Sequence, residues 1–130
     1  MLPEGKDPWW VMPIFQWYDG RINSHFSKVY IKSVERFAEV PRFTQAQLET
    51  FDLIEEIAED PEIHLNMAFE EGDIQLLHNH EILHGRHDYQ DWDEPERRRY
   101  LLRLWISPPN GRPLPPAYAE RYGSIDIGDR

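Results

Sequence analysis

Cysteine is absent from the 130-residue sequence, which excludes a disulfide framework and a thiolate metal site. No apolar run approaches the roughly 20 residues that a transmembrane helix needs. The sequence also starts without the basic and apolar regions of a signal peptide. Positive charge is scarce: 14 Lys and Arg against 24 Asp and Glu give a net charge of -10, which argues against a broad nucleic-acid surface. We therefore expect a cytoplasmic protein that binds neither membranes nor nucleic acids.

The first part of the chain contains one hairpin pattern and one short helical pattern. Asp19-Gly20 is a strong turn signal between two runs of strand-like residues, 9–18 and 21–26, and it predicts a β-hairpin. Residues 27–37 carry apolar side chains at helical spacing, which predicts a short helix. With a hydrophobic content of 40%, the whole chain, residues 1–130, is long enough for one small domain with a single core.

The clearest helix is predicted at residues 44–59. Thr44 and Gln47 have the spacing of a capping box, in which each side chain satisfies a free backbone N–H of the first turn. Phe51 and Ile54 belong to one apolar stripe, while glutamates line the opposite side. We expect this helix to cover a sheet through Phe51 and Ile54.

The second half of the chain is rich in strand patterns. Apolar and polar residues alternate, or short apolar runs occur, at residues 62–69, 74–78, 81–84 and 98–107. Five prolines in residues 108–116 indicate an extended loop or tail, with one helical turn expected at 117–122. The predicted fold class is mainly β with covering helices.

The last predicted strand, residues 98–107, places two arginines on one face. Arg99 and Arg103 are four residues apart, roughly 13 Å along a strand. A guanidinium matches a carboxylate with two parallel hydrogen bonds, and burying it without a partner is costly. This face therefore predicts bound anions or acidic partners. The alternative is an edge strand whose solvated arginines pair with Glu94 or Glu96.

These residues also carry a family resemblance. Between about residues 69 and 105 the chain resembles the C-terminal half of the taurine dioxygenase/clavaminate synthase-like (TauD/TfdA) family. That family consists of Fe(II)/2-oxoglutarate-dependent oxygenases with a double-stranded β-helix, or jelly-roll, core. The matching features are the Gly72-Asp73 turn, the strand ending in Asn79, the His-Gly-Arg sequence of His84, Gly85 and Arg86, and the pair Arg99 and Arg103.

The resemblance implies a role for each matching residue. His84 corresponds to the second histidine of the iron site, and Arg99 to the arginine that holds the distal carboxylate of 2-oxoglutarate. Arg103 corresponds to an arginine that faces the substrate in some members, and Asn79 to an asparagine that supports the turn. The implied cofactors are Fe(II) and 2-oxoglutarate. The implied partners are molecular oxygen and a small organic substrate, on which an acidic group would meet Arg103.

The resemblance also implies an organisation of the chain. Residues from about 9 to 60 would form an insert and covering helix, residues from about 62 to 107 the strands of part of a jelly-roll core, and residues 108–130 a proline-rich tail.

The sequence departs from the family pattern at the iron site. The family's first iron ligands are a histidine and a carboxylate two residues later, and no histidine here has that neighbour. We therefore expect the C-terminal portion of a longer oxygenase. Alone, it would be inactive, and it would self-associate or pair with a missing N-terminal portion.

Three other interpretations remain open at this point. A non-catalytic jelly-roll binding module would keep the arginine pair without redox chemistry. A zinc site is the second, because imidazole is a good zinc ligand and four histidines occur close together, His78, His80, His84 and His87. The third is a nuclease of the His-Asn-His type, suggested by His78-Asn79-His80, although in that motif the three residues are not adjacent in sequence.

Overall fold

The computed structural model describes residues 7–123. Contacts divide the chain into two compact units. Among the described residues, one unit contains Ser24–Leu83 with residues 7–9, and the other contains Trp10–Asn23 with residues 84–123. No helix among residues 7–123 combines the length and the apolar character needed to cross a membrane.

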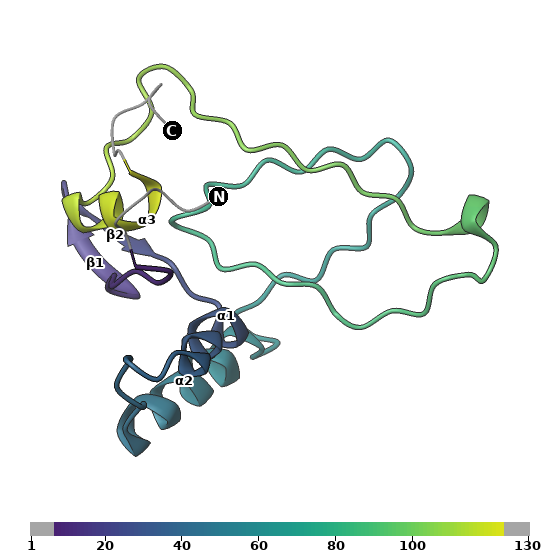
Figure 1. Ribbon diagram of the computed structural model, residues 1–130. Coiled ribbons are helices and arrows are strands. Elements are labelled where there is room, and N and C mark those ends of the chain that lie inside the picture. The colour runs from purple at the N-terminus through teal and green to yellow at the C-terminus, as the bar shows by residue number, and fades with distance from the viewer. Residues whose placement is uncertain (1–6, 124–130) are drawn as a thin grey trace. The chain divides into compact units, whose positions relative to one another are not determined.

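The β-hairpin predicted from the Asp19-Gly20 turn is confirmed. β1 (Phe15–Tyr18) and β2 (Arg21–Ser24) form a two-stranded sheet (Figure 1). Asp19 and Gly20 both adopt positive φ, 48° and 73°, which suits the two central residues of a tight hairpin turn. β1 starts later than the predicted strand at 9–18. Pro13 lies just before it, and proline has no N–H to donate to a ladder.

The two predicted helices are also confirmed. α1 (Lys28–Lys32) continues into the 3-10 helix η1 (Ser33–Arg36). α2 (Gln45–Ala58) begins with the predicted capping box, in which the Thr44 hydroxyl accepts from the Gln47 N–H and the Gln47 side chain accepts from the Thr44 N–H. Two orphan donors of the first turn are thereby satisfied, so the local sequence alone specifies where α2 starts.

α2 packs through Phe51, whose side chain is only 4% exposed. Its ring centroid lies 5.2 Å from that of Phe43, edge to face, and 6.3 Å from that of Phe26. Ile54 is half-buried. The predicted apolar stripe is therefore used, but the partners that the structure shows for Phe51 are aromatic side chains that flank the helices, not a sheet.

Lys28 joins α1 to α2 through two carboxylates. Its Nζ lies 2.6 Å from Asp52 Oδ1 and 2.5 Å from Glu55 Oε2. The hydrogen bonds that Lys28 donates to Asp52 and then to Glu55 raise the pKa of Lys28 above its ordinary value of 10.5. Asp52 is exposed and Glu55 is half-buried, so these pairs stay in contact with solvent, orient the helices and contribute little to stability.

The strands predicted at 62–69, 74–78, 81–84 and 98–107 are not formed, and this prediction is corrected. Outside β1 and β2, the structure has no strand within residues 7–123. Residues 62–107 run as loops and turns, teal to green in Figure 1, with one short 3-10 helix, η2 (Pro95–Arg97). A jelly-roll core is therefore not present among the described residues.

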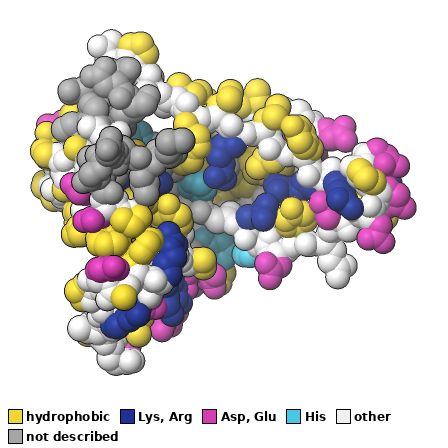
Figure 2. All heavy atoms as spheres, viewed as in Figure 1, with side chains coloured by type: hydrophobic (Ala, Val, Ile, Leu, Met, Phe, Trp, Pro, Cys, Tyr) yellow, Lys and Arg dark blue, Asp and Glu magenta, His cyan; other side chains and the backbone are white. Residues whose placement is uncertain are grey.

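The physical reason is the lack of partners for the apolar alternation. Tyr100 and Leu101 would lie on opposite faces of a strand, yet they are 85% and 52% exposed. Ile74 and Leu76 are 86% and 82% exposed, and many other hydrophobic side chains lie on the surface (Figure 2). A strand needs a neighbour for its backbone hydrogen bonds and a layer to cover its apolar face. The alternation of apolar and polar residues predicts which face of a strand would be buried. It does not provide the neighbouring strand or the covering layer.

The proline-rich segment that was predicted as a tail contributes to a small core. Leu114 and Tyr118 are 2% and 0% exposed, and Pro115 is also buried. The predicted helical turn is confirmed as η3 (Pro116–Tyr118) followed by α3 (Ala119–Tyr122). The sequence argument missed this core because prolines were taken as a loop signal, although proline also favours the first position of a helix, as Pro116 does here. Residues 124–130 of the predicted tail lie outside the described residues.

Candidate functional site

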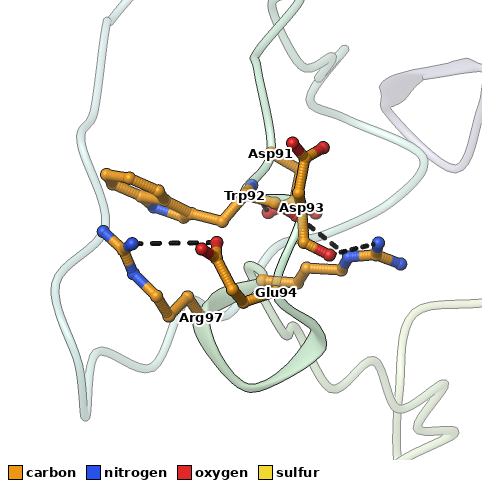
Figure 3. A network of polar contacts seen from close by, with 6 residues as sticks. Asp91, Trp92, Asp93, Glu94 and Arg97 are labelled. Carbon is orange, nitrogen blue, oxygen red and sulfur yellow. Dashed lines mark hydrogen bonds and ion pairs between the residues drawn. The ribbon is translucent and has the colours of Figure 1, made fainter.

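Residues 91–99 form a closed loop that leads directly to Arg99. The Asp91 Oδ1 accepts hydrogen bonds from the backbone N–H of Trp92, at 3.1 Å, and of Arg99, at 2.9 Å. The second bond joins the two ends of the loop across eight residues. Between them, η2 makes one 3-10 turn that begins with Pro95. The loop is thus held by contacts within itself, as Figure 3 shows for part of it.

Four arginines lie close together in the sequence, Arg97, Arg98, Arg99 and Arg103, and the first two are engaged in this loop. The Arg97 Cζ lies 3.2 Å from the centroid of the Trp92 ring, and Arg97 Nη1 lies 3.7 Å from Glu94 Oε2 (Figure 3). Arg98 donates from Nε to the Trp92 carbonyl at 3.0 Å and from Nη2 to the Asp93 carbonyl at 2.8 Å. These guanidiniums therefore brace the loop.

The other two arginines, Arg99 and Arg103, have a different environment. Both side chains are exposed, and neither guanidinium is ion-paired with a carboxylate of residues 7–123. The Arg99 Cζ lies 5.5 Å from the ring centroid of Tyr89, and the Arg103 Cζ lies 6.0 Å from that of Trp105. Glu94, which the alternative interpretation offered as their partner, binds Arg97 instead.

His84 lies in a loop, and its side chain is exposed. The family resemblance implies that His84 and Arg99 serve one site from neighbouring strands of a jelly-roll core, but neither residue is on a strand in this structure. That arrangement requires the missing sheet, because only a ladder fixes two side chains on one face. The roles of His84 and Arg99 stay predictions.

Asn79 is half-buried in a turn between His78 and His80. The His78 carbonyl accepts hydrogen bonds from the backbone N–H of Glu81 and of Ile82, at 3.0 and 3.2 Å. The predicted supporting role of Asn79 is consistent with this place in the turn and stays a prediction.

His80 has a structural contact that the sequence argument missed. Its carbonyl accepts from the backbone N–H of Ser24 at 2.8 Å and from the Ser24 hydroxyl at 3.3 Å. Its side chain is nearly buried, with 9% exposed. A carbonyl can accept from any donor, so no residue pattern signals a contact across 56 positions.

The histidine cluster does not assemble a metal site. The rings of His78 and His80 lie 6.4 Å apart between centroids. Within residues 7–123, no group of three histidine, aspartate or glutamate side chains is close enough to hold a metal ion. A facial iron site needs two histidines and a carboxylate, so the described donors do not fit a complete iron site. The exposed guanidinium of Arg99 does fit one end of a dicarboxylate.

Comparison with known proteins identifies the family. The profile described as "Taurine catabolism dioxygenase TauD, TfdA family" matches residues 3–105. FR-33289 synthase of Streptomyces rubellomurinus (strain ATCC 31215) is 35% identical over 118 residues, which cover 87% of this chain and 34% of that protein. The chain thus spans about a third of the length of this curated relative. No solved structure matches the chain significantly. The resemblance found at residues 69–105 is confirmed and extended towards the N-terminus: the chain belongs to the taurine catabolism dioxygenase TauD, TfdA family.

Proposed function

We propose that this chain supplies part of the active site of an Fe(II)/2-oxoglutarate-dependent oxygenase. The family supports this reaction class, because its members depend on Fe(II) and 2-oxoglutarate. The proposed reaction is the hydroxylation of a small organic substrate by molecular oxygen, coupled to decarboxylation of 2-oxoglutarate. In this proposal Arg99 holds the distal carboxylate of 2-oxoglutarate, and Arg103 meets an acidic group of the substrate.

The observation that carries the proposal is that the neighbouring arginines have different partners. Arg97 and Arg98 are engaged by neighbours in their own loop. Arg99 and Arg103, the two that the family pattern singles out, keep guanidiniums that no described carboxylate neutralises. In a chain with a net charge of -10, such groups are suited to an incoming carboxylate. The closed loop also limits the backbone freedom of Arg99 before any ligand arrives.

The iron site is proposed to be completed by additional polypeptide. His84 would supply one imidazole, and a single imidazole binds Fe(II) weakly, since iron is low in the divalent affinity series. A segment with a His-x-Asp or His-x-Glu sequence would supply the other ligands. The exposed apolar side chains of residues 62–107 support this proposal, because strands of such a segment would cover them.

The first experiment tests whether the chain is incomplete. The purified 130-residue chain is mixed with Fe(II), ascorbate and 2-oxoglutarate, and succinate release is followed together with light scattering. We expect no succinate at enzymatic rates and a tendency to self-associate. Succinate from a monodisperse monomer would show that this chain supplies every iron ligand, and the proposal of a shared site would fail.

The second experiment tests the role of Arg99 in the assembled enzyme. The chain is co-expressed with a segment that carries the His-x-Asp/Glu sequence. Arg99→Ala should weaken 2-oxoglutarate binding by about 2–5 kcal/mol if the pair is desolvated there, while iron binding changes little. Arg99→Lys should restore binding only in part, because an ammonium lacks the planar fork of a guanidinium. Equal weakening of both ligands would indicate collapse of the fold.

A non-catalytic carboxylate-binding module is the second candidate. It is favoured by the same pair of unneutralised guanidiniums, together with the shortage of metal ligands within residues 7–123. The co-expression experiment separates the two candidates. Binding of 2-oxoglutarate without iron-dependent decarboxylation would favour the binding module, and decarboxylation would favour the oxygenase.

A further inference from the structure

Two guanidiniums, those of Arg86 and Arg99, approach the ring of Tyr89, which lies just before the closed loop at residues 91–99. The Cζ of Arg86 lies 4.7 Å from the ring centroid of Tyr89, and the Cζ of Arg99 lies 5.5 Å from the same centroid. Both distances fall within the roughly 6 Å over which a cation is attracted to an aromatic face. Tyr89 therefore holds two residues that are 13 positions apart in the chain near a common point.

This arrangement leaves positive charge uncompensated. Two like charges near one ring repel each other, and the attraction of each to the ring is weak at an exposed site. Neither Arg86 nor Arg99 is ion-paired with a carboxylate of residues 7–123. Two acidic groups of the loop at residues 91–99 have other partners: Asp91 accepts from two backbone N–H groups, and Glu94 pairs with Arg97. An anion placed between the two guanidiniums would relieve the repulsion.

The position of Arg99 in this arrangement is held by its backbone. The Arg99 N–H donates to Asp91 Oδ1 at 2.9 Å, so the residue leaves the closed loop at a defined point. Arg86 has no such restraint among the interactions described, and Tyr89 is its contact. The Tyr89 ring is 47% exposed, which leaves room for a ligand beside it.

We propose that Arg86, Tyr89 and Arg99 form a two-cation carboxylate site, in which Arg86 is a second ligand-binding residue. The inference rests on the proposed function in one respect: it assigns the bound group as the distal carboxylate of 2-oxoglutarate. Two guanidiniums around one carboxylate offer N–H donors to both of its oxygens and two positive charges, so an anionic ligand is bound in preference to a neutral one.

The test is an NMR titration of the full chain with glutarate, a dicarboxylate without the keto group that binds iron. The ring resonances of Tyr89 and the Nε–H resonances of Arg86 and Arg99 report on the site. We expect saturable shifts of all three. Arg86→Ala and Arg99→Ala should each weaken glutarate binding by about two- to fivefold, as for exposed ion pairs. The double variant should lose less than the product of the two effects, because the two residues share one ligand.

Two further variants keep the test specific. Arg86→Lys retains the charge and should preserve part of the affinity, which a purely structural role of Arg86 would not predict. Arg36→Ala is the matched control, because Arg36 is also an exposed arginine near a ring, with its Cζ 4.6 Å from the centroid of Phe37. This control should leave glutarate binding unchanged.

The outcomes separate this inference from the proposed function. Loss of binding in Arg99→Ala but not in Arg86→Ala would overturn the two-cation site and leave the assignment of Arg99 intact. Loss in Arg86→Ala but not in Arg99→Ala would overturn both. Glutarate binding without any shift of the Tyr89 ring would place the anion elsewhere and overturn the inference, while the succinate assay would still judge the oxygenase proposal independently.

Discussion

Replacing Phe51 with alanine tests how the helical part of the chain is held together. Phe51 is 4% exposed, and its ring lies against those of Phe43 and Phe26. Leu53, two residues along α2, is 52% exposed. The two positions therefore compare a buried and an exposed apolar side chain in the same helix.

The expected loss follows from burial. Removing a fully buried phenylalanine side chain costs about 3–5 kcal/mol, from lost transfer free energy and the cavity left behind. The edge-to-face contact with Phe43 accounts for about 0.5–1.5 kcal/mol more than area burial alone. Because a small domain is stable by only about 5–15 kcal/mol, Phe51→Ala should remove a large share of the free energy of unfolding. Leu53→Ala should change it by no more than about 0.5 kcal/mol, as exposed substitutions usually do.

Urea unfolding followed by far-ultraviolet circular dichroism measures both variants. The helical signal comes mainly from α2, so the transition reports on the unit that contains Phe51. We expect the midpoint of Phe51→Ala to fall well below that of the unchanged chain and of Leu53→Ala. If Phe51→Ala lies within about 0.5 kcal/mol of the unchanged chain, the side chain is not buried in solution, and the packing described for α2 is refuted.

Three further predictions concern single local contacts. Thr44→Ala should lower the free energy of unfolding by about 1 kcal/mol through loss of the N-cap, and Thr44→Ser should recover most of it in the same urea assay. Asp91→Ala should speed hydrogen exchange of the Arg99 amide measured by NMR, whereas Asp93→Ala should not; equal rates in both variants would show that the Asp91 contact is not formed. Burial raises the pKa of Tyr118 from 10.0 to about 12, so the unfolded chain releases this proton first and the free energy of unfolding should fall as pH rises from 10.0 to about 12. Tyr118→Phe should flatten that part of the stability curve, and an unchanged slope would contradict the burial of the hydroxyl.

The elements that formed as predicted are those that a few residues close together in the sequence specify. The Asp19-Gly20 turn needs only two residues that accept positive φ, and β1 and β2 follow from it. The start of α2 needs only Thr44 and Gln47, which satisfy each other. In each case the residues that specify the element also complete its hydrogen bonds.

The predictions that were wrong depended on distant partners. The alternation at 98–107 predicts a strand with two different faces, but a strand forms only when another backbone pairs with it, and none does so here within residues 7–123. Leu114, Pro115 and Tyr118 show the reverse case, because their burial is invisible in a segment that local rules mark as a loop. One of the contacts that tie this segment to the hairpin is a hydrogen bond from Arg112 Nη2 to the Ile22 carbonyl, across 90 positions.

For the candidate site too, some features follow from the sequence and others only from the tertiary structure. The sequence by itself identified the family, through the resemblance carried by the His-Gly-Arg sequence at His84 and by the spacing of Arg99 and Arg103. It did not determine which arginines remain available for an anion. Only the tertiary structure decided that Arg97 and Arg98 brace their own loop while Arg99 shares the Tyr89 ring with Arg86, because contacts of a guanidinium depend on how a flexible loop closes and not on residue type.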